Sequence, residues 1–275
     1  MTRLAPIDIK DIPNNLKTYD MELELKTGAN LIQIAKNAAH AGNEVDVKIS
    51  KTKAAVIPVT SGLGLISGFA EAVVAILTHI GVKAKKTNGN DVSGLAEAVR
   101  KKADLIFMAD DDKFIAVNLN TQYIVDNSEA TGRAYVTALD LASGSVQARS
   151  VLVIGVGKVG FAAIGELVKR EATILIYDIN EQKMEYVKKI FKDRVKIFHS
   201  VKEAMNYTNL VILAAPSKKI IHAGMITNNV IISAPAIPLG LTENALIRLP
   251  SRNLIHDPLQ LGVATMALEA IVGIL

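Results

Sequence analysis

The chain has 275 residues, half of which are hydrophobic, and it carries a formal net charge of +4 at pH 7. It has no cysteine and no hydrophobic run near the roughly 20 residues of a membrane span, so we expect a cytoplasmic protein without disulfides or membrane contacts. The lysines are scattered and aromatic residues make up only 4% of the chain, so the positive charge predicts a solvated surface and no nucleic-acid partner.

The first half of the chain alternates helical and extended patterns and predicts an α/β domain. Hydrophobic residues at helical spacing predict helices over residues 16–41, 66–80, 92–102 and 129–142. Short apolar runs predict strands over residues 54–59 and 104–108, and a hairpin with strands 114–119 and 122–125. The last of these helices leads through a short linker into the second half.

From residue 150 onward, short apolar strands alternate regularly with helical patterns. We expect strands over residues 150–154, 173–177, 195–198, 210–214, 230–233 and 253–256. Helices are expected over residues 159–170 and 180–191, with a core helix over residues 261–275. Strands joined by helical crossovers predict a parallel, doubly wound sheet of the Rossmann type. The predicted architecture is therefore α/β, with a substrate domain and linker helix at 1–144, a dinucleotide-binding domain at 145–275 and the active site in the cleft between them.

A glycine-rich turn with a downstream acid carries the strongest functional signal. Gly155 follows a predicted strand and permits a tight turn, Gly157 lets the backbone approach a pyrophosphate, and Gly160 lets helix and strand pack closely. Asp178, at the end of the next strand, would accept hydrogen bonds from ribose hydroxyls and repel a 2′-phosphate. The pattern predicts NAD rather than NADP, and a glycine-rich turn without a ligand is the alternative. The residues expected to bind NAD here are Gly155, Val156, Gly157, Lys158, Val159, Gly160, Asp178 and Ile179.

Small residues and prolines follow three further strands of the predicted Rossmann sheet. They occupy residues 214–217, 233–238 and 257–259. Because ligands of an open α/β sheet lie beyond the carboxyl ends of its strands, these loops suit a rigid wall for the nicotinamide ribose and ring. Ordinary turn chemistry is the alternative. The cofactor-binding candidates in these loops are Ala215, Pro216, Ala234, Pro235 and Asp257.

Two polar segments follow predicted strands in the first half. Thr60-Ser61-Gly62 precedes an apolar helix, so its amides and hydroxyls could bind a substrate carboxylate, or Thr60 or Ser61 could simply cap the helix. Asp110 begins a run of three aspartates, which is typical of a solvated turn; alternatively, Asp110 points into the cleft and binds a substrate ammonium. No metal site is expected, because the run lacks the alternation and glycine of a calcium loop and has no nearby histidine or glutamate.

Several blocks spread over most of the chain resemble the pyrrolysine synthase family. They are residues 56–62 (VIPVTSG), 68–71 (GFAE), 91–94 (DVSG), 108–111 (MADD), 151–161 with the GVGKVGF core, 236–238 and 257–259. The first and fourth blocks are specific, because general dehydrogenases lack them. Departures from the family pattern are Asp257, where glutamate is usual, Gln260, where glycine is usual, and Ala215 and Ala234, where threonine is common.

The resemblance implies an NAD-dependent oxidoreductase. Its small-molecule substrate would be 3-methylornithine joined through its carboxyl group to the side-chain nitrogen of lysine. The terminal amine is oxidised, the α-amine closes the pyrroline ring, and ammonia is released. The resemblance also maps substrate contacts onto Val59, Thr60, Ser61, Ile66, Asp110 and Asn127, with Asp110 as the candidate catalytic residue.

Other functions and the assembly state stay open at this stage. A dehydrogenase for another amino acid or diamine would use the same cofactor residues. A non-catalytic NAD-binding regulatory protein would also carry the glycine turn. The sequence leaves a homo-oligomer open.

Overall fold

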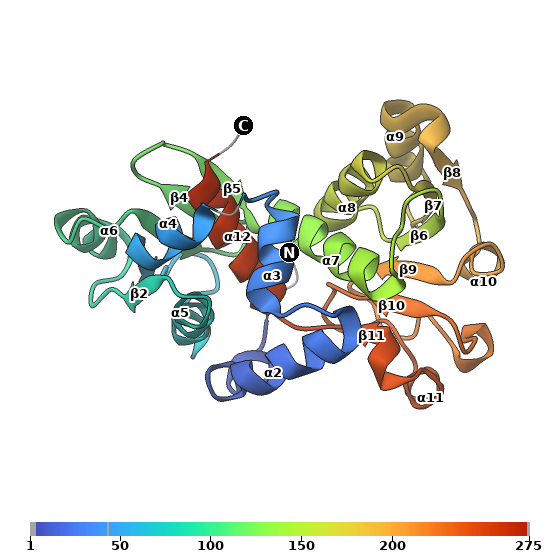
Figure 1. Ribbon diagram of the computed structural model, residues 1–275, viewed down its shortest axis with the longest axis horizontal. Coiled ribbons are helices and arrows are strands. Elements are labelled where there is room, and N and C mark those ends of the chain that lie inside the picture. Colours follow the sequence, from blue (N-terminus) through green and yellow to red (C-terminus); the bar gives the residue numbers. More distant parts are fainter. Residues whose placement is uncertain (1–3, 43, 274–275) are drawn as a thin grey trace.

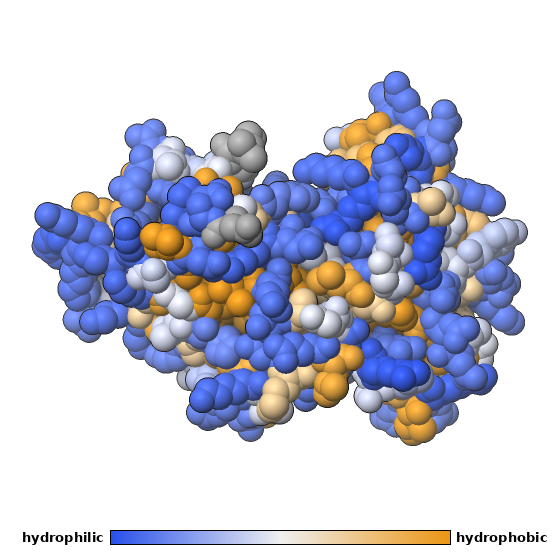
Figure 2. Space-filling view, in the orientation of Figure 1, coloured by the Kyte–Doolittle hydropathy of each residue, from blue (hydrophilic) through white to orange (hydrophobic). Residues whose placement is uncertain are grey.

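A computed structural model describes residues 4–42 and 44–273 and contains two β-sheets on either side of a long helix (Figure 1). The predicted α/β class is confirmed. Figure 2 shows that hydrophilic residues cover most of one face and that the surface is hollowed between the two lobes at the top of the view. None of the helices in the described ranges combines the length and the apolar character needed to cross a membrane.

The first sheet has the strand order β2-β1-β3-β4-β5. Its strands are β1 (Lys53–Ile57), β2 (Lys83–Lys86), β3 (Leu105–Ala109), β4 (Phe114–Asn118) and β5 (Ile124–Asp126). The first three strands are parallel, and β4 and β5 form the predicted antiparallel hairpin. The edge strand β2 was not predicted, because three of its four residues are lysines and the segment was assigned to the solvated surface. Lysines on an edge strand discourage pairing with another chain.

The second sheet has six parallel strands in the order β11-β10-β9-β6-β7-β8. Its strands are β6 (Ser150–Ile154), β7 (Thr173–Tyr177), β8 (Val195–Ile197), β9 (Leu210–Leu213), β10 (Ile231–Ser233) and β11 (Leu254–Ile255). This is the predicted doubly wound sheet. The strand order reverses between β6 and β9, so the loops after these two strands diverge and leave a crevice where ligands of such sheets bind.

The helices of the first half are α1 (Pro6–Ile9), α2 (Ile12–Thr27), α3 (Leu31–Ala38), α4 (Val45–Lys51), α5 (Phe69–His79) and α6 (Asp91–Arg100). The prediction of one helix over residues 16–41 is wrong. Gly28 adopts a left-handed conformation (φ 74°) that ends α2, and the Asn30 side chain caps α3 by accepting the N–H of Gln33.

The helices that follow the glycine turn cover the second sheet. They are α8 (Lys158–Lys169), α9 (Glu181–Phe191), α10 (Val201–Ala204) and α11 (Glu243–Arg248), with 3₁₀ turns at Lys192–Arg194, Ala223–Met225 and Ser251–Asn253. Helices α8 and α9 were predicted within one residue. The short helices α10 and α11 were not, because four to six residues carry too little periodicity to be recognised.

Two helices link the sheets. Helix α7 (Asn127–Ser143) lies between them, with Ala134 in the core of the first sheet and Val136 in that of the second. Helix α12 (Gln260–Val272) confirms the predicted core helix, of which residues 274 and 275 lie outside the described residues. It is buried along its length and packs with Leu31 and Ile34 in the first core. The proposed division between residues 144 and 145 therefore separates the two sheets, while α12 returns to the first.

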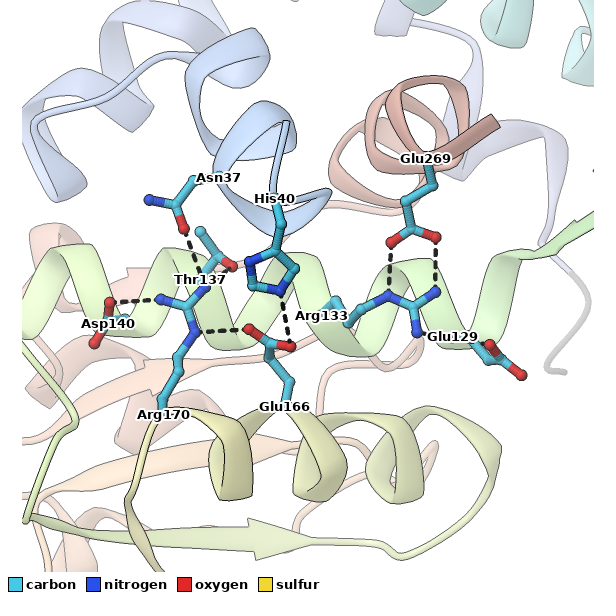
Figure 3. A network of polar contacts seen from close by, with 9 residues as sticks. All are labelled: Asn37, His40, Glu129, Arg133, Thr137, Asp140, Glu166, Arg170 and Glu269. Carbon is cyan, nitrogen blue, oxygen red and sulfur yellow. Dashed lines mark hydrogen bonds and ion pairs between the residues drawn. The ribbon is translucent and has the colours of Figure 1, made fainter. Parts of the chain in front are cut away.

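Two arginines join α7 to helices packed against it (Figure 3). Arg133 on α7 forms two hydrogen bonds of 2.6 and 2.7 Å with the carboxylate of Glu269 on α12. Arg170, directly after α8, forms a 2.7 Å hydrogen bond with Asp140 on α7. Charged pairs thus tie α7 to α12 and to the end of α8.

Candidate functional site

A cavity of about 910 Å³ lies between the two sheets. Its walls come from both halves of the chain: the loop after β1, the start of α5, the ends of β2 and β3, the start of α7, the glycine turn, and the loops after β9, β10 and β11. The residues proposed for the site that line it are Val59, Ile66, Asp110, Asn127, Gly157, Lys158, Val159, Pro216 and Pro235. The structure thus brings candidates from both halves of the chain to one cavity.

The glycine turn between β6 and α8 has a geometry that larger residues would disrupt. Gly155 adopts φ 89°, and a Cβ there would lie 2.7 Å from the backbone nitrogen of Ala215. A Cβ on Gly160 would lie 1.9 Å from the Gly155 carbonyl oxygen. At Gly157, apart from the glycine and its two chain neighbours, no atom of the described residues lies within 4 Å of a Cβ position. Packing therefore requires the outer two glycines, and the middle one leaves open space at the N-terminus of α8.

Asp178 lies directly after β7 and is fixed against this turn. Its Oδ2 accepts the N–H of Val156 at 2.7 Å, and its Oδ1 accepts the N–H of Asn180 at 2.8 Å. A carboxylate oxygen has two lone pairs, so each oxygen can still accept a ribose hydroxyl. The neighbouring Ile179 is 91% exposed and presents an apolar surface beside the carboxylate.

Only some of the cofactor-binding candidates in the loops after β9 and β10 line the cavity. Pro216 and Pro235 line the cavity, together with Ile237 and Leu259. Ala215 packs against the glycine turn, where its nitrogen approaches the Cβ position of Gly155. Ala234 is fully buried and does not line the cavity.

Asp257 does not line the cavity. It is 3% exposed, and its Oδ2 accepts hydrogen bonds from the hydroxyls of Tyr19 on α2 at 2.7 Å and Tyr135 on α7 at 2.9 Å. Its Oδ1 accepts the N–H of Leu259 at 2.9 Å and that of Leu261 at 3.3 Å. Burial, and then the charge of Asp257, raise the pKa of both tyrosines well above the ordinary value, so both hydroxyls stay protonated donors. The structure thus gives this aspartate a packing role that sequence analysis did not detect.

Asp110 lies directly after β3, on the turn into β4. Its Oδ1 accepts the backbone N–H groups of Lys113 at 2.8 Å and Asp112 at 2.9 Å, which shapes the turn into β4. These hydrogen bonds, that from Lys113 first, lower the pKa of Asp110. The residue is exposed and also lines the cavity. An ionised carboxylate is therefore available to a cationic ligand.

The loop after β1 differs from the prediction. Helix α5 begins only at Phe69 and is capped by Gly68 (φ 83°), so neither Thr60 nor Ser61 caps it or stands at its N-terminus. Instead the backbone N–H and Oγ1 of Thr60 donate to the carboxylate of Asp91, at 2.8 and 2.5 Å. Thr60 and Ser61 are exposed and do not line the cavity.

Two charged residues of the cavity wall were missed in the sequence analysis. Lys86, the last residue of β2, donates a hydrogen bond to Glu71 in the first turn of α5. Both line the cavity. The pair is formed by residues from separate elements, so neither a motif nor a spacing indicated it.

Comparisons with known proteins agree with this arrangement. Residues 8–125 match the family described as "Pyrrolysine biosynthesis protein PylD, N-terminal domain", and residues 127–248 match "Alanine dehydrogenase/PNT, C-terminal domain". The chain is 32% identical to the pyrrolysine synthase of Methanosarcina acetivorans over 97% of this chain and 98% of that protein. It is 31% identical to the pyrrolysine synthase of Methanosarcina barkeri, with 97% of each chain covered.

Two solved structures share the fold at low sequence identity. Quinate dehydrogenase from Corynebacterium glutamicum in complex with NAD has a TM-score of 0.53 and 13% identity, covering 81% of this chain and 94% of that chain. Shikimate dehydrogenase from Aquifex aeolicus has a TM-score of 0.52 and 15% identity, covering 79% of this chain and 90% of that chain. The chain therefore shares the two-sheet fold of these two dehydrogenases.

Proposed function

This chain belongs to the pyrrolysine synthase family, and we propose that it oxidises the terminal amine of 3-methylornithine joined through its carboxyl group to the side-chain nitrogen of lysine, with NAD as oxidant. It is a pyrrolysine biosynthesis protein with the fold of an oxidoreductase. One observation carries the proposal: a single cavity joins the glycine turn to the wall segments that the family-specific VIPVTSG and MADD blocks provide.

The residues around the glycine turn fit a dinucleotide. The open space at Gly157 faces the N-terminus of α8, where backbone N–H groups and Lys158 would bind the pyrophosphate. Asp178 would bind the adenosine ribose, as a preference for NAD over NADP requires. Pro216 and Pro235 would form the wall beside the nicotinamide ring. When bound, the ring accepts the hydride.

Asp110 is the residue that we assign to the substrate amine. A carbon loses hydride readily only when its nitrogen is neutral, and a primary amine with a pKa of about 10 is mostly protonated at neutral pH. Because hydrogen bonds from two backbone amides keep Asp110 ionised, it would bind the ammonium and pass a proton to water. The apolar side chains of Val59 and Ile66, which line the same cavity, would exclude water around the reacting carbon.

Ring closure would then be intramolecular. Loss of a hydride from the terminal carbon and of a proton from its nitrogen gives an imine, and the α-amine of the same ornithine attacks the imine carbon. Departure of ammonia leaves a five-membered ring made of the α-nitrogen and four carbons. Effective molarities of well-oriented intramolecular reactions reach about 10⁵ M or more, so closure needs no further catalytic group.

Incubation of the protein with lysine-linked 3-methylornithine and NAD tests the proposal. We expect NADH absorbance to rise in step with a product whose mass shows the loss of ammonia and two hydrogens. A parallel incubation with NADP should be much slower. Stoichiometric NADH with a stable open-chain aldehyde would contradict the ring-closure step, and NAD binding without turnover would support the regulatory alternative.

A further inference from the structure

The pair formed by Glu71 and Lys86 is a charged feature of the cavity that the proposed mechanism does not use. Glu71 lies in the first turn of α5, and Lys86 ends the edge strand β2. Their side chains are 53% and 46% exposed. Exposed ion pairs of this kind contribute little to stability, so a ligand can separate the two charges at little cost.

The distribution of charged side chains in the cavity indicates which ligand groups this pair could bind. Five charged side chains line the cavity among the residues that the structure describes: Glu71, Lys86, Asp110, Asp111 and Lys158. Lys158 belongs to the glycine turn, where we place the cofactor phosphates. Lys86 is therefore the cation that the first sheet offers to a carboxylate in the described part of this cavity. Glu71 stands beside it and offers the opposite charge.

We propose that Glu71 and Lys86 bind the α-amino acid head group of the lysine half of the substrate, with the carboxylate on Lys86 and the ammonium on Glu71. This inference rests on the proposed function, which supplies a substrate with a zwitterion at one end. In the complex each protein charge exchanges its present partner for one on the ligand. Neither protein charge is therefore left without a partner when the ligand is bound.

The position of the pair agrees with the length of the substrate. Lys86 on β2 and Asp110 after β3 are separated by β1, so two strand spacings, about 10 Å, lie between them across the sheet. The reacting carbon and the lysine α-carbon are joined by about ten bonds of roughly 1.5 Å, which span roughly 12 Å in an extended zigzag. A substrate with one end near Asp110 can therefore place its other end at Lys86.

Calorimetric titration without NAD tests the inference, because binding is then measured apart from turnover. The ligands are lysine-linked 3-methylornithine and the pentylamide of 3-methylornithine. The pentylamide has the same carbon chain but lacks the α-amino and carboxyl groups of the lysine half. Lys86→Met should raise the Kd of the full substrate by about 10- to 100-fold, the size of a charge-assisted hydrogen bond, and should leave the Kd of the pentylamide unchanged. Glu71→Gln should act in the same direction, and Lys86→Arg should restore much of the affinity.

The neighbouring lysine of the same strand provides a matched control. Lys85→Met removes the same charge from a side chain that does not line the cavity, so both Kd values should stay at those of the unmodified protein. Equal losses for both ligands in Lys86→Met, or no loss for either, would overturn the inference. NADH formation by the unmodified protein is measured separately, and its absence would instead contradict the proposed function.

Discussion

Removal of Arg170 is the sharpest test of how the two sheets are held together. Its guanidinium donates through Nε to Glu166 at 2.8 Å and through Nη1 to Asp140 at 2.7 Å. Its Nη2 donates to Thr137 at 2.8 Å and to Asn37 at 3.0 Å (Figure 3). One side chain thus joins α8 to α7 and to α3. Arg170→Met keeps most of the aliphatic volume and removes all of these donors.

The expected loss follows from the burial of Glu166. Its side chain is fully buried, and Oε2 accepts no hydrogen bond from the described residues and lies 3.6 Å from Nε2 of His40. Removing one partner of a buried ion pair costs about 3–5 kcal/mol, because the other charge stays buried without compensation. Asp140 adds less, since it is partly exposed and also accepts the N–H of Val146 at 2.8 Å. A loss of this size is a large share of a total stability of about 5–15 kcal/mol.

Urea unfolding followed by circular dichroism measures this loss, since the chain has no tryptophan for a fluorescence signal. The comparison needs Arg170→Met, Glu166→Leu and the double variant. Each single variant removes one partner, whereas the double variant replaces the buried pair with apolar side chains and should recover about 2 kcal/mol or more relative to the sum of the singles. A loss below about 1 kcal/mol in Arg170→Met, or additive single losses, would refute the reasoning.

Three further predictions concern the cavity. Asp178→Asn keeps the shape of the side chain but removes its charge, so the Kd of NAD should rise about 10- to 100-fold while the Kd of NADP does not rise. An unchanged preference between the two cofactors would show that Asp178 does not bind the adenosine ribose. Asp110→Asn should lower kcat/KM about 10- to 1000-fold. Backbone hydrogen bonds lower the pKa of Asp110, so its carboxylate is ionised throughout the assay range. The rise of kcat/KM toward alkaline pH should therefore reflect deprotonation of the substrate amine. The midpoint of that rise should be the same in Asp110→Asn. Gly160→Ala places a Cβ 1.9 Å from the Gly155 carbonyl and should abolish NAD binding, whereas Gly165→Ala on the same helix meets no atom within 4 Å and should retain it.

The strands of the second sheet could be predicted almost completely because each can be recognised from its own short stretch of sequence. Strands β6 and β7 are buried runs of Val, Ile and Leu with the expected bounds, since parallel strands covered on both faces need no polar residues. The glycine turn was equally accessible. The close approach of Gly160 to the Gly155 carbonyl joins residues five positions apart, whereas the contact of Gly155 with Ala215 is distant in the sequence and was not predicted.

The first half was predicted less completely because its features depend on distant contacts. Strand β2 has the composition of a solvated segment, and only its pairing with β1 makes it a strand. The sequence predicted α12 as a core helix but did not show that it packs with the first sheet. The ion pair of Glu71 and Lys86 joins residues from two elements, and its role in the cavity could be seen only once the cavity was known.

Asp257 shows how a residue outside the cavity can still determine its shape. The loop after β11 supplies Pro258 and Leu259 to the cavity wall, and Oδ1 of Asp257 accepts the backbone N–H of Leu259 at 2.9 Å. Its Oδ2 is held by the hydroxyls of Tyr19 and Tyr135, so the wall is anchored to α2 and α7. The longer side chain of a glutamate at this position would move either the carboxylate or the loop by more than a hydrogen bond tolerates. The aspartate therefore acts on the site through the backbone position of its wall, and substitutions there should alter substrate fit before they alter cofactor contacts.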